Sequence, residues 1–401
     1  MPTGTPAGTT ATAMERRRVP VLRPLQERNR DNGSRTKEDQ PPVTQTLPTE
    51  LPDLSSLRQK VGAVLTEFLD TKERAAPGAE LLYLTTALRR LLTGGKRLRS
   101  LLCLYGWQAA GATGDMTAAV RAAASLELFQ VFALVHDDVM DDSDIRRGQP
   151  SAHRALATAY TDGGGPGSRA EAHGLGAAVL LGDLALVWSD ELLRTADLSP
   201  ERLEQVLPLV AEMRSEVMYG QLLDLQTTGR LAGDVDTALH VIRYKTAKYT
   251  IERPLHIGAA VAGATPPVLD ACTAFGIPLG EAFQLRDDLL GVFGDPAKTG
   301  KPVLDDLREG KATVLMALAV QRASTAELKA LREFVGRSDL NEEHAAAVRM
   351  ILNSTGARQT VEEMITTRRA AALAALDNAP FSGSVTASLR RLALDATARQ
   401  T

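Results

Sequence analysis

An unusual density of acidic side chains marks the stretch "LVHDDVMDDSDIRRGQP" at residues 134–150. Five aspartates fall within eight positions, and Arg146 and Arg147 follow them. Carboxylates this close together repel one another, so one interpretation is a solvated acidic face or a helix end. The other is a shared ligand, because Asp137 and Asp141 lie four residues apart on one helical face. Oxygen ligands on adjacent turns suit Mg²⁺, and guanidinium groups bind phosphate in a bidentate manner.

A second carboxylate pair ends another apolar stretch, in "FQLRDDLLGVFGDPAKTGKPVLDDLREGK". Asp287 and Asp288 close the apolar part, and Lys301, Asp305 and Lys311 follow in a polar segment. Two acidic pairs that end apolar helices, with cations nearby, indicate a site for Mg²⁺ and diphosphate groups. The apolar helices behind the carboxylates indicate a hydrophobic shaft for the rest of a substrate.

Three further segments offer groups that bind anions or cations. "GGKRLRS" combines a tight glycine turn with cations at the start of a predicted helix, where the helix N-terminus adds a positive field. "YKTAKYT" sets a cation beside a hydroxyl, and "GQLLDL" puts an amide and a carboxylate on one face. The side chains concerned are Lys96, Arg99, Lys245, Thr246, Gln221 and Asp224.

Helices must position these groups, because apolar residues recur at intervals of three and four from about residue 53 onward. "LPDLSSLRQKVGAVLTEFLD" is the first such segment, and convincing alternating strands are absent. Several later segments are apolar nearly all round, which predicts central helices. The pattern predicts one all-α domain over residues 53–401, with ten or more helices. The further helical segments expected are 81–93, 97–110, 117–141, 152–160, 172–196, 201–227, 235–263, 267–294, 312–334, 341–353 and 357–377.

Composition excludes several functional classes. The chain has 401 residues, of which 44% are hydrophobic and 24% charged, enough for a sizeable core. A net charge of −3 gives no basic field for nucleic acid. Cys103 and Cys272 are expected to be buried free thiols in a reducing compartment, which favours a cytoplasmic location. No membrane span is expected, since Asp183 interrupts the best candidate, "GLGAAVLLGDLALVW". Asp183 itself is interpreted as a buried polar contact, and His136 as a core or hydrogen-bonded histidine.

The N-terminal segment, residues 1–52, is rich in Thr, Pro, Gly, Ala and Arg and predicts a disordered tail. Met14 in "MERRRVPVL" is an alternative start of the protein. The run of arginines that follows it is compatible with a transit peptide.

The motifs quoted above resemble, in their order and spacing, those of the trans-isoprenyl diphosphate synthases, or polyprenyl synthetases. Short-chain geranylgeranyl diphosphate synthases are the most similar type. The resemblance runs from about residue 55 to the last helices. It implies central helices around a deep cavity, a homodimer, and two or three Mg²⁺ ions. The implied reaction is the head-to-tail condensation of isopentenyl diphosphate with allylic diphosphates.

The resemblance also implies roles for individual residues. The implied metal ligands are Asp137, Asp138, Asp141, Asp287 and Asp305. Isopentenyl diphosphate is expected to bind to Lys96, Arg99, Gln130 and Arg147. The allylic diphosphate is expected to bind to Arg146, Lys245, Thr246, Gln284, Lys301 and Lys311. The residues expected to act in catalysis are Asp137, Asp141, Arg146, Lys245, Asp287 and Lys301.

One position departs from the family pattern. The second aspartate motif usually ends in a carboxylate, and here that position is Gly291. Asp295 and Asp305 are the nearest candidates to make up the loss, and Asp305 matches a family position that helps to ligate metal through water.

Product length is expected to depend on the helix that carries the first motif. The residues four, five and eight positions before Asp137 lie one to two turns below it, at about 1.5 Å per residue. They are Ala133, Phe132 and Phe129. In the resembled family a bulky ring at the first of these positions is typical of C15 products, and an aromatic at the second goes with C20. Ala133 and Phe132 therefore predict geranylgeranyl diphosphate, although both rings could simply pack the core.

Other functions fit parts of the sequence. Farnesyl or longer polyprenyl diphosphates are alternative products. A class I terpene cyclase shares the fold and the first motif, but it would carry an Asn/Ser/Glu metal triad where this chain has "RDDLL". A non-catalytic regulatory subunit of a prenyltransferase is favoured by Gly291 and opposed by the intact first motif.

Overall fold

The computed structural model describes residues 54–294 and 304–398, which belong to one compact unit. Helices dominate the described residues, so the predicted all-α fold is confirmed. The tail predicted over residues 1–52 lies outside them.

The helices follow one another with short connections. The first group is α1 (Leu54–Arg74), α2 (Ala79–Leu92), α3 (Leu98–Ala109) and α4 (Thr117–Met140). After the two-residue strands β1 (Ile145–Arg146) and β2 (Gln149–Pro150) come α5 (Ala152–Asp162), η1 (Gly167–Arg169), α6 (Ala170–Arg194) and α7 (Pro200–Thr227). The next are α8 (Val235–Val241), the π-helix η2 (Ile242–Glu252), α9 (Arg253–Ala262) and α10 (Pro266–Phe293). The last are α12 (Asp305–Glu309), α13 (Val314–Arg322), α14 (Thr325–Phe334), α15 (Glu342–Ser354), α16 (Ala357–Asp377) and α17 (Gly383–Thr397).

The core is built around α4, whose apolar sequence is buried along most of its length. Its partners include α6 and α3, and α3 in turn packs on α9. The α3–α9 contact depends on glycine: a Cβ at Gly258 would lie 1.7 Å from the carbonyl oxygen of Cys103, and one at Gly106 would lie 2.0 Å from that of Leu255. Since interiors are close-packed, only glycine permits backbones to approach this closely.

The segment expected as one helix over residues 235–263 is divided, with a π-helix in its middle. Pro254 follows directly at the start of α9, where it has no N–H to donate to a preceding carbonyl. A π-helix widens the turn and is frequent at functional sites. Here it carries Lys245 and Thr246.

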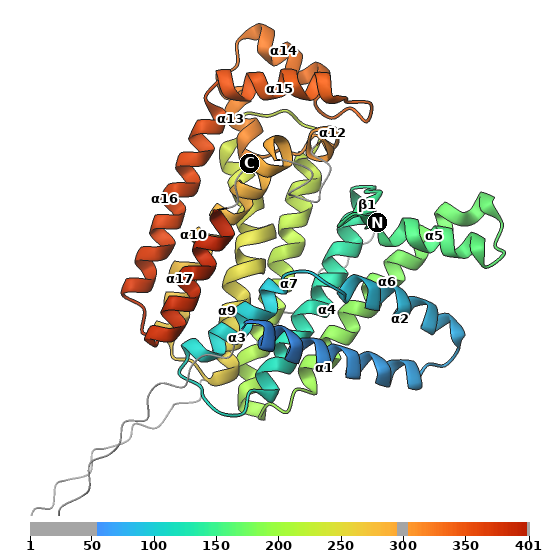
Figure 1. Cartoon of the computed structure of the whole chain (residues 1–401), viewed down its shortest axis with the longest axis vertical. Helices are drawn as coiled ribbons and strands as arrows, with labels where there is room; N and C mark the ends of the chain where they lie inside the picture. Colours follow the sequence, from blue (N-terminus) through green and yellow to red (C-terminus); the bar gives the residue numbers. More distant parts are fainter. Residues whose placement is uncertain (1–53, 295–303, 399–401) are drawn as a thin grey trace, which may run out of the picture. The chain divides into compact units, whose positions relative to one another are not determined.

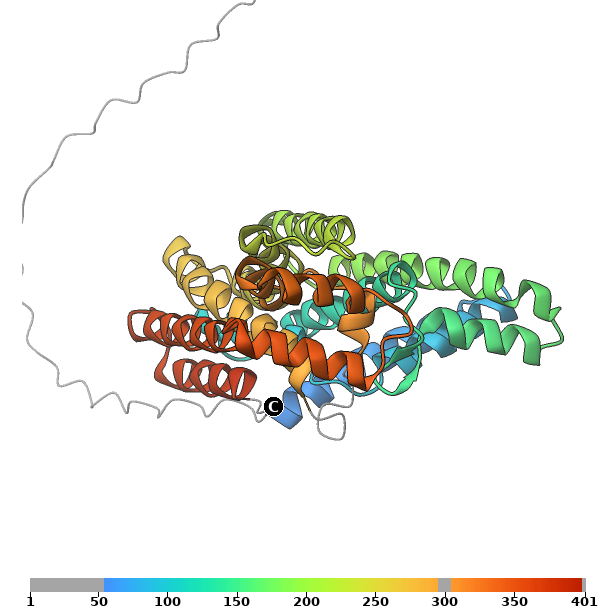
Figure 2. The same ribbon diagram turned by 90° about the horizontal axis from the view of Figure 1, so that it is seen from above.

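Two further differences concern the C-terminal third. The expected helix over 312–334 is broken, because Ser324 and Glu327 form a capping box that starts α14. The helix α17 was not foreseen. In Figure 1, α16 runs beside α10 and next to α17, while α14 and α15 lie across one end of the bundle. Figures 1 and 2 both show α5 and the first half of α6 extending from the bundle.

Two helical segments are long and apolar enough to cross a membrane, which the sequence analysis did not anticipate. They are Thr117–Met140 and Gly167–Arg194. The most apolar window is 61% buried inside the protein in the first and 28% in the second. The first segment is therefore explained as the core helix of this fold. The second is mostly exposed, and its length and composition alone do not make it a membrane span.

Candidate active site

Three central helices bring their C-terminal ends to one place. Asp137 and Asp141 lie at the end of α4, Asp224 lies near the end of α7, and Asp287 and Asp288 lie near the end of α10. The end of a helix carries partial negative charge, which adds to that of the carboxylates. The site therefore favours cations.

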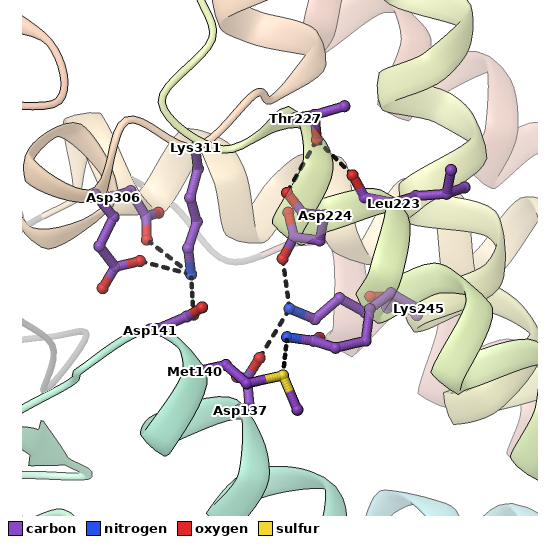
Figure 3. Close-up of polar contacts among 12 residues, drawn as sticks. Asp137, Met140, Asp141, Leu223, Asp224, Thr227, Lys245, Asp306 and Lys311 are labelled. Carbon is purple, nitrogen blue, oxygen red and sulfur yellow. Dashed lines mark hydrogen bonds and ion pairs between the residues drawn. The ribbon is translucent and has the colours of Figure 1, made fainter.

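Two lysines occupy this acidic site in the described structure (Figure 3). The Nζ atom of Lys245 lies 2.9 Å from Oδ1 of Asp137 and 2.6 Å from Oδ2 of Asp224. The Nζ atom of Lys311 lies 2.9 Å from Oε2 of Glu309 and 3.7 Å from Oδ2 of Asp141. Asp137 and Asp141 thus each lie beside one lysine from a distant segment.

These contacts separate the two aspartates in acidity. Burial raises the pKa of Asp137, but the charge and hydrogen bond of Lys245, together with the charges of Arg146 and Lys311, outweigh that effect. The pKa of Asp137 therefore lies below its usual value. Burial and the neighbouring Asp137 raise the pKa of Asp141 to about 6. Two carboxylates that disfavour each other's charge are stabilised by a divalent cation.

Asp138, the third predicted ligand on α4, has another partner. Only 1% of its surface is exposed, and Nε of Arg146 donates to its Oδ1 at 2.7 Å. The strand pair β1–β2 brings Arg146 back over the end of α4, where it also lies 3.4 Å from Asp137. Arg146 therefore holds the end of the motif together, with Asp138 as its anchor.

The second motif continues as a chain of hydrogen bonds. The hydroxyl of Thr246 donates to Oε1 of Gln284 at 2.9 Å, and Nε2 of Gln284 donates to Asp288 at 2.8 Å. Burial raises the pKa of Asp288 to about 8, although the Gln284 hydrogen bond acts against it. Asp287 lies on the neighbouring, partly exposed face of α10.

The gap at Gly291 is filled by Asp306. A Cβ at Gly291 would lie 1.9 Å from Oδ2 of Asp306, so this carboxylate takes the space of the missing side chain. The expected substitute, Asp305, instead lies 3.5 Å from Arg308. Asp295 and the predicted ligand Lys301 are outside the described residues.

A cationic cavity of about 380 Å³ lies beside the carboxylates. Its lining includes all four residues expected to bind isopentenyl diphosphate: Lys96, Arg99, Gln130 and Arg147. Gly95, with φ +76°, turns the chain so that its α-carbon faces the guanidinium of Arg147, and a Cβ there would lie 3.1 Å from Nη1. Nη2 of Arg99 donates to the hydroxyl of Thr250 at 2.7 Å.

An apolar cavity of about 300 Å³ opens from the same place and runs between α4 and α7. Asp137 and Lys245 belong to its polar end, and Phe132 and Ala133 line it further down α4. Phe129 is fully buried and does not line it. The two cavities share four lining residues, namely Arg99, Gln130, Leu134 and Thr246.

Tyr249 was not identified from the sequence, although it lines the apolar cavity and contacts two of the residues that line both cavities. Its hydroxyl donates to Oε1 of Gln130 at 2.5 Å, and the guanidinium carbon of Arg99 lies 4.2 Å from its ring centroid. Burial raises its pKa to about 12, so the phenol stays protonated. The available signal was its place in "YKTAKYT", four residues after Lys245. Asp306 and Glu309 were also missed.

His136 and Asp183 form a contact at the side of the apolar cavity. Nε2 of His136 lies 3.6 Å from Oδ1 of Asp183, and its ring meets that of Phe132 edge-on at 4.7 Å between centroids. The side chain of Asp183 is 58% exposed. The expectation of a buried carboxylate at Asp183 is therefore wrong, although the polar contact exists.

Comparison with known proteins identifies the family to which the chain belongs. Residues 82–352, well over half of the chain, match the polyprenyl synthetase family. The chain belongs to the polyprenyl synthetase family. It is a prenyltransferase, a trans-prenyl diphosphate synthase, as the motifs predicted.

Relatives of this polyprenyl synthetase differ in product. The geranylfarnesyl diphosphate synthase of Aeropyrum pernix is 34% identical over 245 residues, which cover 60% of this chain and 71% of that protein. The (2E,6E)-farnesyl diphosphate synthase of Mycobacterium tuberculosis is 33% identical over 268 residues, covering 66% and 68%. A crystal structure of geranylgeranyl pyrophosphate synthase from Corynebacterium glutamicum, complexed with isoprenyl diphosphate and magnesium, is 42% identical. It superposes with a TM-score of 0.83 over 87% of this chain and 100% of that chain.

Proposed function

We propose that this polyprenyl synthetase condenses isopentenyl diphosphate with allylic diphosphates in a Mg²⁺-dependent reaction, and that its main product is geranylgeranyl diphosphate. The observation that carries the proposal is the pair of adjoining cavities. One is lined by cations and suits a diphosphate, and the other is apolar with carboxylates at its polar end. Because they share Arg99, Gln130 and Thr246, two substrates bound there would meet.

The donor set fits Mg²⁺. This ion binds through one or two carboxylates plus substrate phosphates, and it keeps several waters. Within the described residues no group of three acidic, histidine or cysteine side chains forms a complete protein cage. Paired carboxylates that face a diphosphate site are what such a mixed coordination sphere requires. We assign Asp137, Asp141 and Asp287 as its ligands, with Asp306 in the place left by Gly291.

The reaction follows from these positions. Bound Mg²⁺ would neutralise the departing diphosphate, and Arg146, Lys245 and Lys311 add positive charge around it. The allylic carbon–oxygen bond breaks, and the resulting cation is kept from water in the apolar cavity. Lys96, Arg99, Gln130 and Arg147 hold isopentenyl diphosphate so that its double bond attacks that carbon. The released diphosphate accepts the proton that is lost.

The C20 product is supported by the two residues that line the cavity below Asp137. The small side chain of Ala133 leaves the cavity open one turn below Asp137. The ring of Phe132, about 7.5 Å from Asp137 along the helix, takes up space at the next position. A longer prenyl chain would meet this ring first.

We also propose a homodimer formed through α6 and α7. Large apolar side chains on these helices are about half exposed or more, with Leu180 at 61%, Val187 at 60% and Tyr219 at 48%. Such side chains are stabilised by burial against a second copy. Sedimentation of the full chain should show a dimer that Leu180→Glu and Val187→Glu together dissociate.

Cys103 and Cys272 are buried free thiols, as predicted, and support a reducing, cytoplasmic location.

The deciding experiment incubates the purified protein with labelled isopentenyl diphosphate and, separately, C5, C10 and C15 allylic primers. We expect C20 diphosphate from each primer, and no product when Mg²⁺ is chelated. Cyclic hydrocarbons would indicate a cyclase. Activity that appears only after a second synthase is added would indicate a regulatory subunit.

A further inference from the structure

Two aromatic rings of α4 lie at the side of the apolar cavity away from Asp137. Phe132 lines the cavity, and the fully buried Phe129, which does not line it, packs on Phe132 with ring centroids 5.2 Å apart. Tyr249 meets Phe129 edge-on at 5.6 Å. Phe129 is eight residues before Asp137, or about 12 Å along α4.

A charged side chain from another helix lies against this second ring. The guanidinium carbon of Arg214 is 5.5 Å from the ring centroid of Phe129. Arg214 belongs to α7, where Val217, Met218 and Gln221 line the cavity. Spacings of three, four and seven residues put all of them on one face of the helix, with Arg214 at the lower end.

The guanidinium is fixed in position by α6. Nη1 of Arg214 donates to Oδ1 of Asp190 at 3.1 Å, and Nη2 lies 3.3 Å from the hydroxyl of Ser189. Asp190 also binds Arg194, with Nε to Oδ2 at 2.5 Å. Only 20% of the Arg214 side chain is exposed. A side chain with two acceptors on a packed helix has little freedom to move aside.

We propose that Arg214 determines product length, as the fixed charged stop behind the Phe132–Phe129 pair. The inference rests on the proposed function. A growing prenyl chain can displace aromatic rings, because it replaces one apolar contact with another. Behind Phe129 it would meet a guanidinium, and an apolar chain pressed against this cation would remove it from polar contacts without replacing them. Elongation therefore ends above Arg214.

The test measures the product distribution of the full-length enzyme with labelled isopentenyl diphosphate and a C15 primer. Arg214→Met keeps an unbranched side chain over Phe129 but removes the charge. We expect products of C25 and longer to rise at least fivefold as a share of the total, with total incorporation within about twofold of wild type. Arg214→Lys, which keeps a cation, should retain the wild-type distribution.

Arg194→Met is the matched control, because it removes a cation from the same Asp190 without touching Phe129. It should leave the distribution unchanged. The proposal is overturned if Arg214→Met leaves product length unchanged while Phe132→Ala lengthens it, or if Arg194→Met lengthens the product equally. If Arg214→Met does not fold, Asp190→Asn decides, since it releases the guanidinium and should lengthen products. A wild-type enzyme that forms no prenyl diphosphate would contradict the proposed function instead.

Discussion

At the scale of single residues, each aspartate of the first motif lies beside a basic side chain. Asp137 binds Lys245, Asp138 binds Arg146, and Asp141 lies near Lys311. The sequence predicted that the carboxylates at the ends of two apolar helices would lie near Arg146, Lys245 and Lys311. It did not predict Tyr249, Asp306 or Glu309. It could not predict which member of a pair faces the site. Neighbouring residues on a helix point about 100° apart, so the choice between Asp305 and Asp306 depends on how the helix is rotated.

The first prediction concerns the metal. Asp137→Asn removes one carboxylate that would neutralise the leaving diphosphate, so turnover should fall by about 10²-fold or more. The fold should survive, since repulsion from Asp141 is relieved. Steady-state kinetics with saturating substrates and circular dichroism check both statements. Near-normal turnover would remove Asp137 from the metal site.

The second prediction separates two adjacent carboxylates. Asp306→Asn should raise the Mg²⁺ concentration for half-maximal activity, whereas Asp305→Asn, which lies near Arg308, should leave it unchanged. Gly291→Asp alone should not lower that concentration, because its Cβ would displace the carboxylate of Asp306. Combined with Asp306→Ala, it should restore the wild-type value. A Mg²⁺ titration that moves only with Asp305 would contradict the assignment.

The third prediction concerns the cavity lining. Ala133→Phe should shorten the main product to C15, because the ring would close the cavity one turn below Asp137. Phe132→Ala should allow longer chains. Chromatography of the dephosphorylated products gives both answers, and a wild-type enzyme that already stops at C15 would place the floor elsewhere.

At the scale of elements, close backbone contacts accompany the π-helix, which apolar periodicity could not predict. Apolar spacing located most helices, but the π-helix depends on close approach from both sides. A Cβ at Gly220 of α7 would lie 2.4 Å from the backbone nitrogen of Lys245, and one at Gly280 of α10 would lie 2.4 Å from Cα of Ala247. These contacts link segments far apart in sequence, so no local pattern shows them.

The fourth prediction tests one such contact. Gly258→Ala should destabilise the protein by about 3 kcal/mol or more, because the new methyl group would overlap the carbonyl oxygen of Cys103 and force α3 from α9. Gly176→Ala is the control: nothing lies within 4 Å of its Cβ position in α6, and alanine favours a helix by about 1 kcal/mol. Urea unfolding should show opposite signs for the two variants.

At the scale of the whole molecule, the burial of acidic groups couples the site to global stability. Asp288 has a pKa raised to about 8, above the value of about 3.9 in an unfolded chain. A raised pKa means that the folded state prefers the protonated form. Its contribution to stability is therefore complete below about pH 4 and is lost progressively as pH rises from about 4 to just above 8.

The fifth prediction follows from that sign. Without Mg²⁺, the free energy of unfolding should fall by about 1 kcal/mol between pH 7 and pH 9. In the Asp288→Asn variant, most of that decrease in the free energy of unfolding should disappear. Urea unfolding at several pH values in a chelating buffer provides the measurement. An equal decrease in both proteins would assign it to other groups.

The lysines described between the carboxylates have a further consequence for the order of events at the site. A divalent ion arriving alone must expel Lys245 or Lys311 from Asp137 or Asp141, so that the ammonium group loses one of its carboxylate partners. A diphosphate arriving alone must draw the same lysines away and leave Asp137 or Asp141 with less positive charge beside it. When both arrive, each relieves the deficit caused by the other. Binding of ion and substrate is then cooperative, and by thermodynamic reciprocity each should increase the affinity for the other by the same factor.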